Sequence, residues 1–246
     1  MRVPLAIVSV ALRRSLGGKR PFLALLTAVP LIRLLAAGEE PAFTVFHESM
    51  AFLMILVHPI ICLVLGAATL GDDKRHETLS ILITKPIRRG VIVAAKMSGS
   101  VVATLILMAP ASLVLIAFSG GSAERWDTAA PLAVLLLLNT IGYVGIFAPL
   151  GYVFARAVFA GLAYILIWEA SISFVEGLAP ASIWRIGMSA YVSMVDGVPA
   201  DVSEILGSVA PGAGGAAAKA VAVAAAGGLM LTAMLMRRDL AGSTAG

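Results

Sequence analysis

Residues 50–70 read MAFLMILVHPIICLVLGAATL, a stretch that contains no aspartate, glutamate, lysine or arginine. A helix crosses the ~30 Å hydrocarbon core of a bilayer with roughly 20 apolar residues, which is the length of this stretch. The rest of the chain has the same character, because 60% of its 246 residues are hydrophobic, 13% are charged and the mean hydropathy is +0.98. A soluble domain cannot bury so much apolar surface. The sequence therefore predicts an all-α integral membrane protein.

Further apolar stretches flank this one and complete a prediction of six transmembrane helices in a single domain over 1–246. Residues 129–168 form an apolar block that is too long for one crossing, so a hairpin is expected between Gly151 and Arg156. The last stretch is rich in alanine and glycine and includes Lys219. The predicted spans are 22–37, 50–70, 91–118, 131–154, 157–175 and 213–236.

The basic residues indicate the orientation, because lysine and arginine collect in short cytoplasmic loops. With six spans and a cytoplasmic N-terminus, 14 of the 18 basic residues fall inside. We therefore predict a multi-pass protein of the cell (plasma) membrane with both termini in the cytoplasm. The net charge of +4 then reflects membrane sidedness, and no basic patch with interleaved aromatics points to nucleic acid, which we exclude as a partner.

Two segments outside the spans have helical patterns. Residues 1–20 alternate apolar and basic side chains, which favours a helix lying in the cytoplasmic membrane surface over an ordinary basic flank. Residues 178–211 are too polar to cross and are predicted to form short helices at the outer face, with Asp201 and Glu204 as a capping box or as plain solvated loop residues. Cys62 is the only cysteine, so neither a disulfide nor a cysteine metal cluster is expected, and we assign it to packing.

The loop between the second and third spans is the most informative stretch, and residues 71–96 read GDDKRHETLSILITKPIRRGVIVAAK. Asp72 or Asp73 is placed to cap a short amphipathic helix, which Pro86 ends. Its apolar face consists of Leu79, Leu82 and Ile83 at helical spacing. Basic residues follow at the level of the lipid headgroups, and Lys96 is able to snorkel toward them. The pattern predicts a helix parallel to the membrane.

This segment resembles the cytoplasmic segment of ABC-2 type permeases, the membrane subunits of ATP-driven exporters. The ordered match consists of Asp73, Thr78, Leu79, Leu82, Ile83, Pro86, Arg89 and Lys96. Two positions depart from the family pattern, because Glu77 replaces the usual glycine before the threonine and Arg75 replaces an acidic residue. The interfacial helix, six spans and external helices also agree with the family in outline.

The resemblance implies a permease subunit in which residues 72–90 form the coupling segment that docks on a separate cytoplasmic ABC ATPase. A second permease subunit, identical or different, is implied as well, and ATP and Mg²⁺ belong to the ATPase. The residues expected to couple are Asp73, Glu77, Thr78, Leu79, Leu82, Ile83, Pro86 and Arg89.

We expect no catalytic activity and no cofactor or metal on this chain. Its nearest approach to a phosphate-binding loop is Gly212–Lys219, where Ala218 and Ala220 occupy positions that need glycine and a hydroxyl residue. No arrangement of nucleophile, paired carboxylates or metal ligands indicates a membrane-embedded enzyme. The alternative function is a membrane scaffold or assembly factor that transports nothing.

Polar residues inside predicted spans are candidates for function, because they are costly in lipid. Glu169, with Ser173 and Glu176 on the same helical face, is a candidate for the transport pathway or a dimer interface, or else for a structural hydrogen bond or an interfacial anchor. Asn139 is expected to make an interhelical hydrogen bond rather than bind substrate. His58 and Pro59 indicate a kink, and the small residues Ala95, Gly99 and Ala103 indicate close helix packing.

Overall fold

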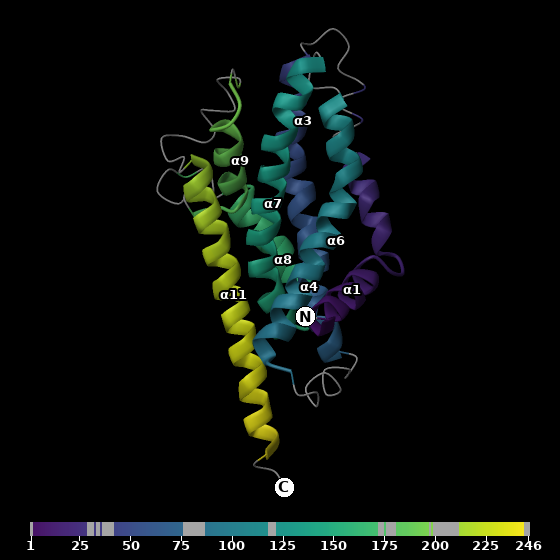
Figure 1. Cartoon of the computed structure of the whole chain (residues 1–246), viewed down its shortest axis with the longest axis vertical. Coiled ribbons are helices and arrows are strands. Elements are labelled where there is room, and N and C mark those ends of the chain that lie inside the picture. The colour runs from purple at the N-terminus through teal and green to yellow at the C-terminus, as the bar shows by residue number, and fades with distance from the viewer. Residues whose placement is uncertain are drawn as a thin grey trace.

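A computed structural model describes residues 2–28, 32, 35, 42–75, 87–117, 122–171, 175, 181–196, 198 and 212–243. The described part of the chain consists of helices joined by short turns and contains no strand (Figure 1). In chain order its elements are α1 (Arg2–Ser15), η1 (Arg20–Thr27), α3 (Ala42–Phe52), η2 (Leu53–Val57), α4 (His58–Arg75), α6 (Arg89–Ala117), α7 (Ser122–Val153), α8 (Ala157–Ala163), η3 (Tyr164–Glu169), α9 (Trp184–Val192) and α11 (Gly212–Ser243).

Four helices among the described residues are long and apolar enough to cross a membrane. They coincide with the predicted second, third, fourth and sixth spans. Their membrane-length portions are Val45–Arg75, Arg89–Ala117, Asp127–Val153 and Gly212–Arg237. The predicted hairpin is also present, because α7 ends at Val153 and α8 begins at Ala157.

The first and fifth predicted spans are not among these four helices. The start of 22–37 belongs to a 3₁₀ helix that ends at Thr27, and most of residues 29–37 lie outside the described part of the chain. The fifth helix runs only from Ala157 to Glu169, and turn residues come directly after it, so its predicted end at Val175 is wrong. At 1.5 Å per residue this helix is about 20 Å long, shorter than the bilayer core.

The first membrane-length helix, Val45–Arg75, contains an irregular turn just before its proline. Leu53–Val57 form a π-helical turn, and Pro59 follows in the first turn of α4. Proline lacks a backbone N–H and its ring crowds the preceding turn, so a wider turn relieves the conflict. The irregular turn thus lies directly before His58 and Pro59, the two residues at which a kink was predicted.

Glycine allows α7 to approach both α4 and α11 closely. The space that a side chain at Gly151 would need is filled by the backbone of Ala67 in α4, and the backbone of Gly145 likewise fills the space at Gly227 in α11. Close approach of this kind is the usual function of small residues between membrane helices. The predicted stripe on α6 acts in the same way, since a Cβ on Gly99 would lie 2.7 Å from Ala11 Cβ of α1.

Two short helices, α1 and α9, pack against the long helices of this bundle. The helix α1 lies obliquely across α6 at the end where the C-terminus also lies (Figure 1). The helix α9 packs on α7 and α11, and its first turn contacts α7 at Asn139 and Gly142, near the middle of that helix. Part of the segment 178–211, predicted as external, thus reaches into the bundle. Its predicted capping residues lie outside the described residues.

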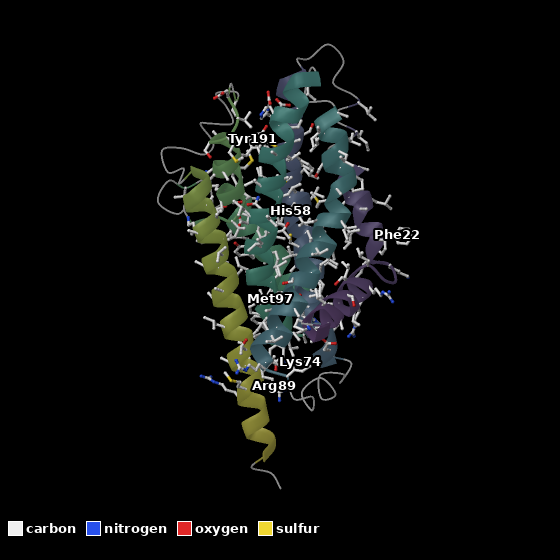
Figure 2. The ribbon with its side chains drawn as sticks, in the orientation of Figure 1. Phe22, His58, Lys74, Arg89, Met97 and Tyr191 are labelled. Carbon is white, nitrogen blue, oxygen red and sulfur yellow. The ribbon has the colours of Figure 1, made fainter. Side chains whose placement is uncertain are left out.

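The side chains separate into a packed interior and an apolar outer surface. Rings and long aliphatic groups such as Trp184, Tyr143 and Phe147 are completely buried. Large apolar side chains also cover the outside, and Phe22 projects away from the bundle (Figure 2) with 68% of its surface exposed. In lipid such exposure costs nothing, so the surface agrees with a membrane environment.

Candidate functional site: the charged end of the bundle

The carboxylates of Asp72 and Asp73 lie in the last turn of α4. The prediction that one of them caps a separate helix is wrong, because α4 continues through both residues to Arg75. A carboxylate at a helix C-terminus is unfavourable, since the helix dipole is negative there. Cations from other elements must therefore compensate them.

Asp73 receives two such cations. Arg14 Nη1 donates to Asp73 Oδ1 at 2.5 Å, and Lys96 Nζ donates to Asp73 Oδ2. Asp73 and Lys96 are both buried, whereas the Arg14 side chain is 39% exposed. Lys96 is turned inward to the carboxylate, which differs from the predicted snorkelling toward lipid headgroups. The ion pairs join α1, α4 and α6 at one point.

Asp72 makes a second pair of contacts beside the first. It accepts from Arg20 at the start of η1 and from Arg75 Nη2 at 2.5 Å. Arg20 also donates to the Arg14 carbonyl at 3.1 Å, which connects the two sets of contacts. We call this group the charge cluster, and its members are Arg14, Arg20, Asp72, Asp73, Arg75 and Lys96.

Lys74 extends these contacts to α7. Its Nζ donates to the Tyr152 carbonyl at 2.8 Å and lies 4.9 Å from the centre of the Tyr152 ring. A cation at the last carbonyls of α7 is favoured by the helix dipole, and the ring adds a cation–π contact. The final turn of α4 is therefore bound to α1, η1, α6 and α7.

The predicted coupling segment begins at this cluster and ends at the start of α6. Asp73 belongs to the cluster, and Arg89 is the first residue of α6 (Figure 2). The structure thus pairs Asp73 and Lys96, the first and last residues of the matched motif. The other predicted coupling residues lie outside the described residues: Glu77, Thr78, Leu79, Leu82, Ile83 and Pro86.

Glu169 forms a second polar site in the interior and is fully buried. Its Oε1 accepts from the Tyr164 hydroxyl at 2.6 Å and from the Ile183 backbone N–H at 3.0 Å. Its Oε2 accepts from the Ser182 hydroxyl at 2.6 Å. The carboxylate therefore stands at the N-terminus of α9, where the positive end of the helix dipole stabilises it. Ser173 and Glu176, predicted on the same face, lie outside the described residues.

Asn139, in α7, binds the same N-terminal end of α9 as Glu169 does. Its Nδ2 donates to the Trp184 carbonyl at 3.4 Å, and its Oδ1 accepts from the Gly187 N–H at 2.9 Å. At the other end of α9, Tyr191 shares a 3.1 Å hydrogen bond with His47 Nε2. Burial raises the pKa of Tyr191, so its hydroxyl stays protonated. Asn139 and Glu169 thus act together on α9.

The sequence indicated the functional carboxylates Asp73 and Glu169, but it did not indicate the residues that bind them. Arg14 and Asp73 are 59 residues apart, and Arg20 and Asp72 are 52 apart, so no local spacing connects them. A usable signal was the excess of cations in residues 1–20 beside two adjacent acids on the same predicted side. Tyr164 and Ser182 gave no comparable signal for Glu169.

The comparisons with known proteins give the family of the chain. A family model described as "ABC-2 family transporter protein" matches residues 16–183. The match includes the charge cluster except Arg14, the whole segment between α4 and α6, and Glu169. None of the curated proteins matches the chain. Because the family model covers more than half of a chain whose helices have membrane length and composition, this protein is a membrane permease of the ABC-2 transporter family.

Proposed function

We propose that this chain is the membrane subunit of an ABC exporter and that a separate cytoplasmic ATPase docks on the segment between Arg75 and Arg89. The ATPase supplies ATP and Mg²⁺ chemistry, and a second permease subunit completes the transporter. The supporting observation is the charge cluster, which binds the end of α4 directly before this segment to α1, η1 and, through Lys96, to α6, the helix that follows the segment.

The cluster gives a physical route for coupling. A force on the docking segment acts on Asp72 and Asp73 at the end of α4, and their cations belong to α1, η1 and α6. Losing one partner of the buried Asp73–Lys96 pair is expected to cost about 3–5 kcal/mol, so this pair is expected to persist while α4 and α6 move together. Closure of the ATPase then displaces several helices as one unit. We place the cluster and both termini in the cytoplasm, at the plasma membrane.

The test is complex formation with the candidate ATPase. Leu79→Asp and Leu82→Asp place charges on the predicted apolar face, and each is expected to abolish co-purification with the ATPase and stimulation of ATP hydrolysis. The matched control is Lys19→Asp, a change at an exposed position near the cluster, which is expected to leave both intact. A folded variant with Leu79→Asp that still binds and stimulates the ATPase would overturn the proposal and favour a scaffold.

A further inference from the structure

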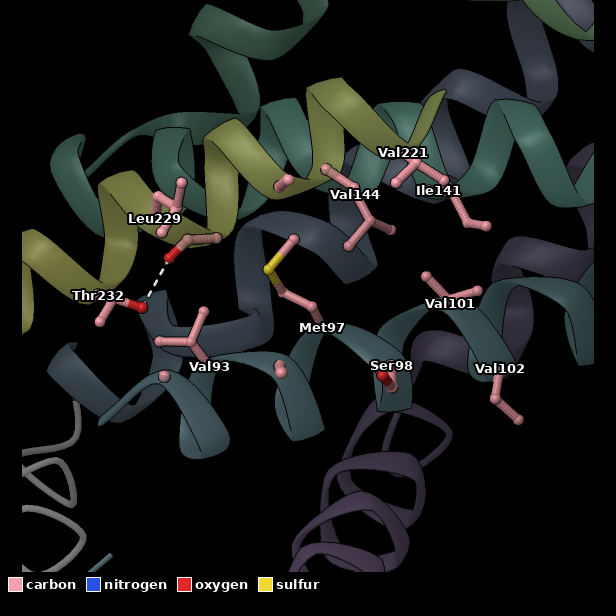
Figure 3. A pocket seen from close by; sticks show the side chains of 15 residues that line it. Val93, Met97, Ser98, Val101, Val102, Ile141, Val144, Val221, Leu229 and Thr232 are labelled. Atoms are coloured by element: carbon pink, nitrogen blue, oxygen red, sulfur yellow. Dashed lines mark hydrogen bonds between the residues drawn. The ribbon is translucent and has the colours of Figure 1, made fainter. Parts of the chain in front are cut away.

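A groove runs between α6 and α11 over one face of α7 (Figure 3). It has a volume of about 660 Å³, and the Met97 side chain extends into it from α6. None of its described lining residues is charged, and glycine or alanine at Gly90, Ala94, Ala225 and Gly228 keeps it open. Because both helices are of membrane type, the groove faces hydrocarbon.

The dimensions of the groove fit part of a lipid. The lining runs from Gly90 to Val102 on α6 and from Val221 to Thr232 on α11. At 1.5 Å per residue these stretches extend over about 16–18 Å, close to the ~15 Å thickness of one leaflet of the hydrocarbon core. The groove therefore has the length of one acyl layer.

The charge at one end of the groove indicates the headgroup. Arg88 and Arg89 immediately precede Gly90, the first lining residue on α6. Arg88 is exposed and Arg89 is half-buried. Basic residues at the membrane surface beside a gap between helices attract anionic headgroups.

We infer that the α6–α11 groove binds an anionic phospholipid, with an acyl chain along Met97 and Gly228 and its phosphate at Arg88 and Arg89. In the orientation proposed above, this lipid comes from the cytoplasmic leaflet. The inference is independent of ATPase docking, since the groove is formed by residues of the bundle itself.

The experiment uses the full chain in nanodiscs of phosphatidylcholine and phosphatidylglycerol, with a trace of phospholipid that carries a photoactivatable diazirine in its acyl chain. After illumination, the labelled peptides are identified by mass spectrometry. Label is expected in 90–102 and 221–232, and roughly fivefold more from the phosphatidylglycerol probe than from the phosphatidylcholine probe.

Matched variants identify the site. Ala225→Phe fills the groove, whereas Ala226→Phe adds the same ring at an exposed position outside its lining. The first is expected to remove the label from both stretches and the second to leave it. The double variant Arg88→Gln, Arg89→Gln is expected to reduce phosphatidylglycerol labelling to the phosphatidylcholine level.

Three outcomes would overturn the inference. They are equal labelling of Ala225→Phe and Ala226→Phe, equal labelling by the two probes, and efficient disulfide formation between two copies of an Ala225→Cys variant in nanodiscs. The last result would show that a second copy of the chain occupies the groove. Cys62 does not interfere, because it is buried.

Discussion

Lys96 near the start of α6 donates to Asp73 in the last turn of α4, and both side chains are buried. This ion pair connects the two helices that flank the segment proposed to bind the ATPase. It also makes the two helices depend on each other for stability.

The change Lys96→Met leaves the Asp73 carboxylate buried with one cation fewer, and we expect a loss of about 3 kcal/mol in the free energy of unfolding. Asp73→Asn is expected to cost a similar amount. The double variant should lose about 1–3 kcal/mol less than the sum, because the second change removes a buried charge that has already lost one of its cations. Denaturant unfolding in detergent micelles measures this cycle. Strictly additive losses would show that the pair contributes nothing to stability.

Arg14 and Arg13 form a matched pair on α1, since Arg14 binds Asp73 and Arg13 is exposed. We expect Arg14→Gln to loosen α1 from the bundle and Arg13→Gln to leave it in place. The energetic effect is small, about 1 kcal/mol, because Arg14 is partly exposed. Hydrogen exchange of Arg2–Ser15 reports it directly. Equal exchange in the two variants would exclude Arg14 as an anchor of α1.

Replacing Glu169 tests its role at the start of α9. In Glu169→Gln the amide oxygen still accepts from the Ile183 N–H, whereas Glu169→Ala leaves this buried donor unsatisfied. We expect Ala to cost about 2 kcal/mol more than Gln in unfolding free energy, with faster hydrogen exchange in Trp184–Val192. If the Gln and Ala variants have the same unfolding free energy and both lose export, the result would favour a role of Glu169 in the transport pathway over a structural role.

Gly151 and Gly214 differ in what an added methyl group would meet. At Gly151 it would collide with the backbone of Ala67, whereas at Gly214 it would meet open space. Gly151→Ala is expected to lower stability by about 1–3 kcal/mol through forced separation of α4 and α7. Gly214→Ala should be neutral or slightly stabilising, because alanine favours helix. Thermal unfolding compares them, and a tolerated Gly151→Ala would contradict the close approach.

Single cysteines test the proposed orientation. Arg237→Cys lies at the end of α11 nearest the C-terminus, and Asp127→Cys lies at the outer start of α7; both positions are exposed. A membrane-impermeant maleimide is expected to label Asp127→Cys in intact cells and Arg237→Cys only after permeabilisation. The reverse labelling pattern would show that the proposed orientation is wrong and that the C-terminus lies outside.

The long helices were predictable because length and hydropathy alone determine them. The end of α4 at Arg75 was not predictable from the sequence. The helix contains two carboxylates in its last turn, and the cations that neutralise them, Arg14, Arg20 and Lys96, come from other elements. Such long-range pairing leaves no periodic trace in the sequence. The early end at Glu169 was missed for the same reason. There the Trp184 indole donates to the Glu169 carbonyl at 3.3 Å, and the Ser182 hydroxyl binds its carboxylate.

The contact between Asp73 and Lys96 has a further consequence in terms of chain entropy. It joins two residues that are 23 positions apart, so the chain between them is a closed loop before any partner arrives. Bringing the ends of a loop together costs configurational freedom, and here the membrane domain bears that cost on folding. An ATPase that binds the loop meets ends already held together. Its affinity should therefore depend weakly on a few inserted residues but strongly on the integrity of this single contact.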